Sequence, residues 1–176
     1  MAKIMFMSPN EELCSFAKTV LNNPSDIDFT IGLLDQAEEI VEKGLKQGTK
    51  VVVTRGGTAF ALKSTFSGLT VVEIPVTAYD ILRAALAARD KGQKIALIGF
   101  PNMVRGAMAI CPLLGLDLAI KEVRQAEEAL PLVQEAAVQG ANVIMGGLLT
   151  TNTATSLGLK TVVIDWGKEA ILEAVS

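Results

Sequence analysis

The chain has no histidine, and this absence excludes several kinds of catalytic site. Without an imidazole there is no Ser–His or Cys–His nucleophile pair, no histidine zinc ligand and no use of the commonest general base. Only two cysteines are present, Cys14 and Cys111, which are too few for a disulfide framework and lack metal-ligand spacing. We therefore predict neither a metal nor a cofactor. Carboxylates, lysines or thiols could still support catalysis.

Long apolar runs are also missing. The longest runs, such as Ile95–Ile98, have the length of a strand and not that of a membrane span. The N-terminal stretch MAKIMFMSPNEEL has acidic residues where a secretion signal needs an apolar core. These features predict a soluble, cytoplasmic protein with no membrane partner. The net charge of −3 lacks the basic excess of nucleic-acid-binding proteins, so we expect no direct nucleic-acid contact.

What the sequence does contain is a repeat. The blocks KIMFMSPN, DQAEEI, KQGTKVVVTRGGT and LTVVEIPVTAYDILRAAL are followed about ninety residues later, in the same order, by KIALIGFPN, RQAEEA, VQGANVIMGGLLT and LKTVVIDWGKEAILEAV. The glycine pair after Arg55 recurs in the second copy, with Met145 or Gly146 in place of the arginine. Four matched blocks in one order predict an internal duplication.

Each copy alternates apolar strands with helical patterns. The strands are expected at 3–8, 27–33, 50–54 and 70–74, and again at 94–99, 117–123, 142–145 and 160–164. The helices are expected at 10–22, 35–47, 58–65 and 78–91, and again at 103–114, 125–139, 150–157 and 167–175. This alternation is typical of parallel sheets covered on both faces. The predicted fold class is α/β, with two similar Rossmann-like lobes, parallel sheets flanked by helices, and an arrangement like that of periplasmic binding proteins.

The expected lobe boundaries are 1–77 for the first lobe and 78–176 for the second, with the chain crossing between lobes near 78–93. The C-terminal helix at 167–175 is a candidate to pack back on the first lobe. No Pro- or Ser-rich linker separates the two copies. Two similar lobes joined without slack favour a hinge, and ligands favour the crevice between such lobes.

Four segments with unusual residues follow the carboxyl ends of predicted strands, where ligands of open α/β sheets collect. Glycines let a ligand approach the backbone, helix starts add partial positive charge, and arginine matches a carboxylate or phosphate. We therefore expect these segments to bind a small anionic metabolite such as a carboxylic acid. The candidate ligand-binding residues are Ser8, Asn10, Arg55, Gly56, Gly57, Thr58, Phe100, Asn102, Arg105, Gly146, Gly147, Thr150, Thr151 and Asn152.

These candidates also have plainer structural interpretations. The Arg-Gly-Gly-Thr segment can be a tight turn from strand to helix with its arginine in solvent. The threonine cluster at 150–153 can be a group of helix caps, since Thr and Asn are common there. Asn10 and Asn102 favour helix capping over ligand binding, and Phe100 favours packing.

The segment VVVTRGGTAFALKSTFSGLTVVEIPVTAYDILRAAL resembles the N-terminal sensory domain of the propionate catabolism activator (PrpR) family of sigma-54-dependent transcriptional regulators. That family has a similar Arg-Gly-Gly-Thr turn, an Ile-Pro-Val-like strand and a Tyr/Phe-Asp-Ile-Leu helix. The segments KIALIGFPNMV and GANVIMGGLLTTNTATSLGLKTVVI resemble later parts of the family. The likeness extends over nearly the whole chain, and the order of motifs is more specific than any one of them.

The resemblance implies a two-lobed sensor, and not an enzyme, that binds a small metabolite between its lobes. In the propionate regulator this ligand is a tricarboxylate, 2-methylcitrate. By position, the resemblance places Arg55–Thr58, Gly146–Gly147 and Thr150–Asn152 on the ligand side. With Arg55, Arg105, Lys63 and Arg124 as the candidate cations, a tricarboxylate is compatible with the sequence but not required by it.

Full-length relatives also carry an ATPase module and a DNA-binding helix-turn-helix. The chain has no GxxxxGK[ST] motif, so it is expected to be either an excised domain or a free-standing sensor. Pairing of two chains into a homodimer is left open.

Two other classes of function remain as alternatives. One is a cofactor-independent racemase or lyase acting on a small acid, with Cys14 and Cys111 as its thiols. The two cysteines do not occupy equivalent positions in the two copies of the repeat, and neither comes directly after a predicted strand. Buried structural cysteines are therefore the favoured interpretation. The other alternative is an oligomerisation module without a saturable ligand.

Overall fold

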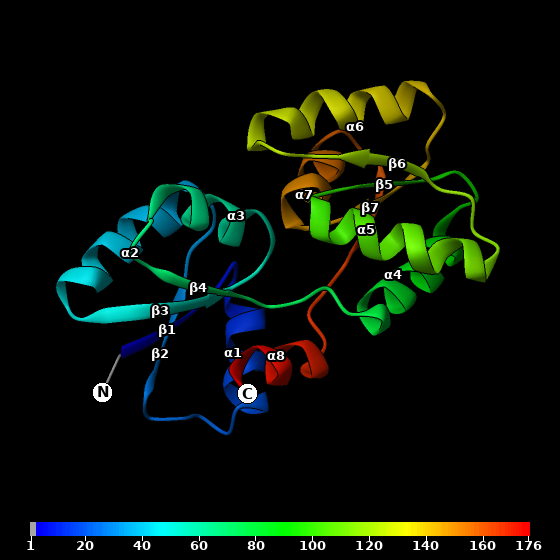
Figure 1. The fold of residues 1–176 in the computed structure, drawn as a ribbon. Helices are drawn as coiled ribbons and strands as arrows, with labels where there is room; N and C mark the ends of the chain where they lie inside the picture. The colour runs from blue at the N-terminus through cyan, green and yellow to red at the C-terminus, as the bar shows by residue number, and fades with distance from the viewer. Residues whose placement is uncertain (1–2) are drawn as a thin grey trace. The chain divides into compact units, whose positions relative to one another are not determined.

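The computed structural model describes residues 3–176, apart from the side chain of Asp35, and contains two compact units. Unit 1 is the chain up to Pro75 together with Lys168–Ser176, and unit 2 is Val76–Gly167. Each unit is built on a four-stranded parallel sheet with helices on both faces (Figure 1). The predicted α/β class with flanked parallel sheets is therefore confirmed.

Unit 1 has the sheet order β2-β1-β3-β4, with all neighbouring strands parallel. Its strands are β1 (Lys3–Ser8), β2 (Ile27–Ile31), β3 (Thr49–Thr54) and β4 (Thr70–Glu73). Its helices are α1 (Glu11–Val20), α2 (Asp35–Lys46), α3 (Gly56–Thr65) and α8 (Lys168–Val175). Helices connect the parallel strands, as parallel pairing requires.

Unit 2 repeats this order as β6-β5-β7-β8. Its strands are β5 (Ile95–Gly99), β6 (Ala119–Glu122), β7 (Val143–Gly146) and β8 (Lys160–Val163). Its helices are α4 (Ala78–Lys91), α5 (Pro101–Ile110), α6 (Ala129–Val138) and α7 (Leu148–Ser156), with short 3₁₀ turns η1 (Cys111–Leu114) and η2 (Ala126–Glu128). The shared strand order is what an internal duplication produces.

Equivalent backbone hydrogen bonds recur in the two units and fix the structural alignment of the copies. The N–H of Ile74 donates to Thr54 O at 2.7 Å, and the N–H of Ile164 donates to Gly146 O at 2.8 Å. Thr54 and Gly146 are the last residues of the third strand of each sheet. Residues 74 and 164 are therefore matched, and so are the residues that follow them.

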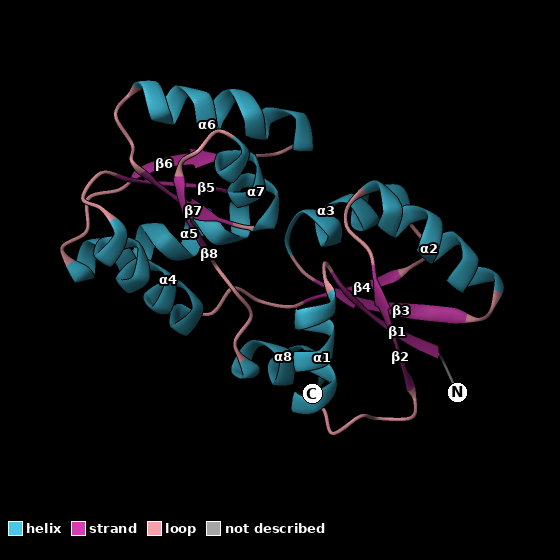
Figure 2. Ribbon diagram, turned by 180° about the vertical axis from the view of Figure 1, so that it is seen from behind, coloured by secondary structure: helices cyan, strands magenta, loops and turns pink. Residues whose placement is uncertain are grey.

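Each sheet is covered by a different pair of helices on each face. In unit 1, α2 and α3 cover one face, while α1 and α8 lie on the other (Figures 1 and 2). Met5, Met7 and Val52 of the strands pack with Val41 of α2 and Leu62 of α3. In unit 2, α6 and α7 pack on one face, and α4 and α5 pack on the other.

The two copies exchange their last helices. Helix α4 follows β4 of unit 1 but packs against β7, β8 and α5 of unit 2. Helix α8 follows β8 of unit 2 but packs against α1 of unit 1. The buried faces of the exchanged helices are formed by Ile81, Ala84, Ala85 and Ala88 in α4 and by Ala170 and Ile171 in α8.

Three helices begin two residues earlier than the sequence predicts. Helix α3 begins at Gly56, α5 at Pro101 and α7 at Leu148. Residues expected in loops therefore lie in first helical turns. Within residues 3–176, no helix combines the length and the apolar character that a membrane-spanning helix needs.

Candidate functional site

The central strands of both sheets lead at their carboxyl ends into α1 and α3 in unit 1 and into α5 and α7 in unit 2. The first N–H groups of a helix have no intrahelical acceptor and carry partial positive charge. In α1 this charge is offset by Glu11 and Glu12, whereas α3, α5 and α7 have no acidic residue in the first turn. These three helix starts are therefore suited to an anion.

Arg55 is the residue that distinguishes the start of α3. It is the N-cap residue, with an extended backbone (φ −136°, ψ 158°), and is only 5% exposed. Among residues 3–176 it is the only lysine or arginine that is buried. The interpretation with this arginine in solvent is wrong. A buried guanidinium at the positive end of a helix is stabilised by negative charge placed beside it.

The glycines and threonine after Arg55 shape this helix start. Gly56 has a φ of +65°, which is the left-handed region that favours glycine. Thr58 is buried, and its Oγ1 accepts a hydrogen bond of 3.2 Å from the N–H of Leu34. Leu34 itself has a φ of +50°, unusual for a side chain of this size. The Thr58 hydroxyl therefore holds the strained loop between β2 and α2 against the start of α3.

In unit 2 the residue equivalent to Arg55 is Gly147, which is the N-cap residue of α7. The expectation that Met145 or Gly146 replaces the arginine is wrong, because β7 continues through Gly146. Gly146 lies where a Cβ would collide with the carbonyl oxygen of Ile98 and with Oγ1 of Thr150. Gly146 therefore permits a close approach of β7, β5 and α7.

The threonines of the second copy lie inside α7 and not in a loop. Thr150, the match of Thr58, donates its hydroxyl to Ile98 O at 2.9 Å and Gly147 O at 3.1 Å. Thr151 is buried and donates to Gly147 O at 2.9 Å, whereas Asn152 is exposed. Two of the candidate ligand donors thus use their protons on backbone carbonyls of their own unit.

Ser8 and Asn10 organise the start of α1. Ser8 is fully buried, and its hydroxyl donates to Asn10 O at 2.9 Å. The side chain of Asn10 accepts from the N–H of Leu13 at 2.9 Å, so the capping interpretation of Asn10 is confirmed.

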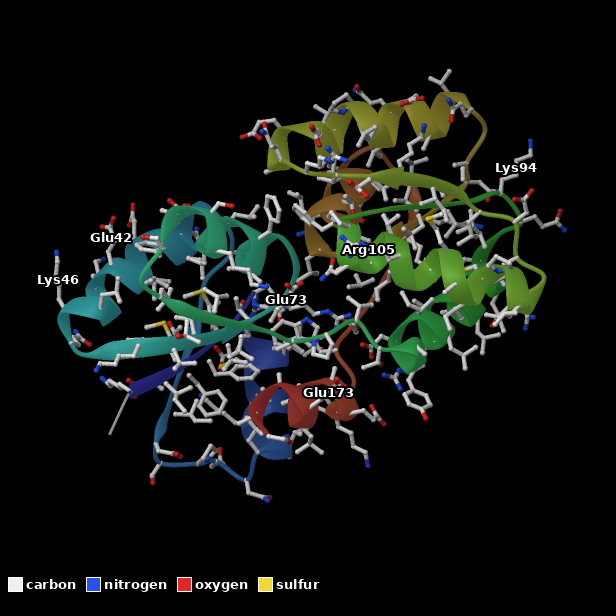
Figure 3. All side chains as sticks on the ribbon, in the orientation of Figure 1. Glu42, Lys46, Glu73, Lys94, Arg105 and Glu173 are labelled. Carbon is white, nitrogen blue, oxygen red and sulfur yellow. The ribbon has the colours of Figure 1, made fainter. Side chains whose placement is uncertain are left out.

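The start of α5 combines a packed aromatic ring with an exposed cation. Phe100 is the N-cap residue and packs with Ile98 and Val133, which confirms the packing interpretation. Because Phe100 holds the cap position, the expectation of a cap at Asn102 is wrong; the side-chain oxygen of Asn102 instead accepts from the adjacent N–H of Met103 at 2.8 Å. Arg105 is exposed on α5 (Figure 3).

Two further candidate cations are held in surface ion pairs. Lys63 of α3 pairs with Glu73 at the end of β4 at 2.7 Å, and Glu73 is labelled in Figure 3. Arg124 pairs with Glu122 at 2.9 Å. These pairs lower the attraction of both cations for an external anion.

Both thiols are in the interior of their units. Cys14 is 2% exposed on α1, and Cys111 is 1% exposed at the start of η1. Burial raises the pKa of the Cys111 thiol, so this thiol stays protonated at neutral pH. Because a thiolate is the reactive form of cysteine, this counts against the enzyme alternative with paired thiols.

The sequence profile of the family described as Propionate catabolism activator matches residues 22–176. The chain belongs to this family. An NtrC family transcriptional regulator from Clostridium acetobutylicum has a similar structure, with a TM-score of 0.83, 25% sequence identity, and coverage of 98% of this chain and 91% of that one. The predicted resemblance is therefore confirmed, and the chain is a regulatory domain of the propionate-activator type.

Other solved structures are similar to this propionate-activator domain at lower levels. The transcription regulator CcpA of Lactococcus lactis has a TM-score of 0.45 and 12% identity, with coverage of 89% of this chain and 73% of that one. A periplasmic solute binding protein of an ABC transporter from Actinobacillus succinogenes 130z, with bound D-allose, has a TM-score of 0.42 and 14% identity, with coverage of 91% and 75%. No curated protein sequence matches the chain.

We expect Thr150→Val to lower the free energy of unfolding of this propionate-activator domain by about 1–2 kcal/mol. Valine keeps the shape of the side chain but removes the hydroxyl that donates to Ile98 O. Urea denaturation measures the loss. Asn152→Ala, at an exposed position of the same helix, should change the free energy by less than about 0.5 kcal/mol. Equal effects of the two changes would contradict the described role of Thr150.

Proposed function

We propose that this domain is a sensor for a small anionic metabolite of the carboxylic acid class, and that the anion binds at the start of α3. The observation that carries the proposal is Arg55, a buried guanidinium at the N-terminus of a helix whose first turn has no acidic residue. The helix start and the guanidinium both favour an anion, and a carboxylate can accept two parallel hydrogen bonds from an arginine.

The residues next to Arg55 support an anion at this place. Gly56 and Gly57 have no side chains, so a ligand can approach the first backbone N–H groups of α3. Thr58 keeps the loop that contains Leu34 in position beside them. In unit 2, the starts of α5 and α7 also lack acidic residues, and Arg105 lies on α5. At the start of α3 alone, the guanidinium and the free first-turn N–H groups fit a carboxylate better than a neutral ligand.

Family membership supports a regulatory use of such binding. The similar protein from Clostridium acetobutylicum is a transcriptional regulator of the NtrC family. In this proposal the anion binds one conformation of the domain more tightly than another and so shifts their populations. An ATPase module and a helix-turn-helix of the kind that full-length relatives carry would then respond to the shift, within the cytoplasm. A hundredfold difference in affinity between the two conformations corresponds to about 2.7 kcal/mol. This is enough to make the ligand-binding conformation the more populated one when it is a minor state without ligand.

A thermal-shift titration with citrate, tricarballylate, malate and succinate tests the proposal. At a ligand concentration about one hundred times its dissociation constant, the domain should gain about 2.7 kcal/mol of apparent stability. The Arg55→Met variant should lose the ligand-dependent shift, because methionine keeps much of the apolar stem but has no charge.

Arg89→Met is the matched control, because it removes the same charge from an exposed position in the last turn of α4. It should keep the full shift. Comparison with and without ligand separates loss of binding from any loss of stability in Arg55→Met. An unchanged shift in Arg55→Met, or no shift with any of the four acids, would count against the proposal.

A further inference from the structure

Asp80 is a buried carboxylate with a cap function in α4. Its side chain is 0% exposed. Asp80 Oδ2 accepts from the N–H of Thr77 at 3.0 Å, and Oγ1 of Thr77 accepts from the N–H of Asp80 at 3.2 Å. This reciprocal pair is a capping box at the start of the helix. It uses one of the two carboxylate oxygens.

The other oxygen accepts a hydrogen bond from Gly167, the last residue of unit 2 in the sequence. The N–H of Gly167 donates to Asp80 Oδ1 at 3.0 Å, and this bond is buried. Arg83 donates to the same oxygen through Nη2 at 2.7 Å, with its side chain 54% exposed. The guanidinium therefore offsets the charge from the solvent side, while the two backbone donors hold the carboxylate from within the protein.

Thr77 and Gly167 occupy equivalent places in the two copies. Each lies three residues after a matched residue, Ile74 in one copy and Ile164 in the other, and each immediately precedes an exchanged helix. The second copy has Ala170 where the first has Asp80. Helix α8 therefore has no carboxylate at the position equivalent to Asp80. Asp80 in α4 instead accepts hydrogen bonds from two backbone N–H groups, that of Thr77 before α4 and that of Gly167 before α8.

These two N–H groups also mark the places where the chain passes between the units. Unit 2 begins at Val76, one residue before Thr77, and it ends at Gly167. The two connections, Pro75–Val76 and Gly167–Lys168, are therefore adjacent to the two backbone donors of Asp80. They cannot separate without leaving a buried carboxylate or a buried N–H group without its hydrogen bond, which is costly.

We propose that Asp80 is a crossover clamp: it holds both connections between the units together, so that any movement of one unit against the other turns about this carboxylate. An N3 residue that served only the capping box would need only the hydrogen bond from the N–H of Thr77. The bond from Gly167 adds nothing to the start of α4, and it joins residues 87 positions apart in the sequence. The clamp does not depend on which ligand the domain binds.

Amide-resolved hydrogen exchange by NMR distinguishes a clamp from a cap. In Asp80→Ala the exchange rates of the Thr77 and Gly167 amides should both rise roughly tenfold to a hundredfold, because both donors lose a charged acceptor. Thr77→Ala is the matched control, since it weakens the cap of α4 but leaves the carboxylate in place. Gly167 exchange should then be unchanged. An unchanged Gly167 rate in Asp80→Ala would overturn the proposal.

Asp80→Asn keeps the experiment decisive if alanine prevents folding. Asparagine has one oxygen acceptor, so it should keep one of the two amides protected and release the other. Equal protection of both amides, as in the unaltered protein, would also overturn the clamp.

A second readout reports on the units directly. Nitroxides can be attached at Lys46→Cys in unit 1 and Val138→Cys in unit 2, which are exposed positions, with the buried Cys14 and Cys111 left in place. The distribution of label-to-label distances should broaden in Asp80→Ala and stay the same in Thr77→Ala. A distribution that does not change in Asp80→Ala would show that Asp80 does not restrain the units.

Discussion

Gly146→Ala should lower the free energy of unfolding of this domain by about 3 kcal/mol or more. The new Cβ would collide with the carbonyl oxygen of Ile98 and with Oγ1 of Thr150, which are joined by a hydrogen bond. Both lie in the buried centre of unit 2, where the backbone of β5 cannot move without disturbing its pairing with β7. The melting temperature of unit 2 should fall by more than about 10 °C.

Gly106→Ala is the matched control in the same unit. A Cβ there meets only the side chain of Ile81, at an ordinary contact distance of 3.4 Å. Because alanine favours a helix over glycine, this change in α5 should be neutral or stabilising by up to about 1 kcal/mol. If Gly146→Ala were tolerated equally well, the close packing of β5, β7 and α7 would be refuted.

Ending the chain at Gly167 should destabilise unit 1 more than unit 2, although the deleted residues follow the last strand of unit 2. The deletion removes α8, which packs against α1 and buries Ala170 and Ile171 completely. The loss of these apolar contacts and the exposure of the facing side of α1 should cost about 3–5 kcal/mol. Hydrogen exchange should accelerate in β1 and β3 and stay slow in β5 and β7.

Two single substitutions in α8 provide the control for this deletion. Ile171 is fully buried, whereas its neighbour Leu172 is 46% exposed. Ile171→Ala should cost about 2–5 kcal/mol in unit 1, and Leu172→Ala should cost less than about 1 kcal/mol. A deletion that loosened unit 2 first would contradict the assignment of α8 to unit 1.

The strands were predictable because they are continuous apolar runs, and the repeat predicted the same succession of strands and helices along the chain in both copies. The starts of α3, α5 and α7 were not. Glycine and proline read as loop residues in a sequence, so Gly56 and Pro101 were placed outside their helices. Proline is in fact well suited to a first helical position, because its missing N–H would have no intrahelical acceptor there.

The residues of the candidate site could be selected from the sequence, but their burial and hydrogen bonds could not. A strand followed by Arg-Gly-Gly-Thr is the pattern that led us to expect an anion site. The burial of Arg55 could not be predicted from this pattern, because it depends on residues that are distant in the sequence. The hydroxyl of Thr150 was a candidate ligand donor, and its hydrogen bond to Ile98 joins residues 52 positions apart. Contacts over such separations depend on strand order and register, which local patterns do not specify.

The role of Asp80 shows the same limit more strongly. Its motif, Thr-Ala-Tyr-Asp, predicts a helix start, and the capping box with Thr77 agrees with that reading. The sequence near Asp80 contains no sign of Gly167. The only hint is a difference between the copies, since Ala170 stands in the second copy where Asp80 stands in the first.

The reciprocal exchange of α4 and α8 gives this single chain the connectivity of a domain-swapped dimer. Two separate copies of one repeat could make the same helix contacts within each unit by trading their terminal helices. Gene fusion of such a pair would preserve every contact and free the two copies to diverge. The single carboxylate at position 80 and the single buried arginine at position 55 are then differences that a symmetric ancestor could not have had.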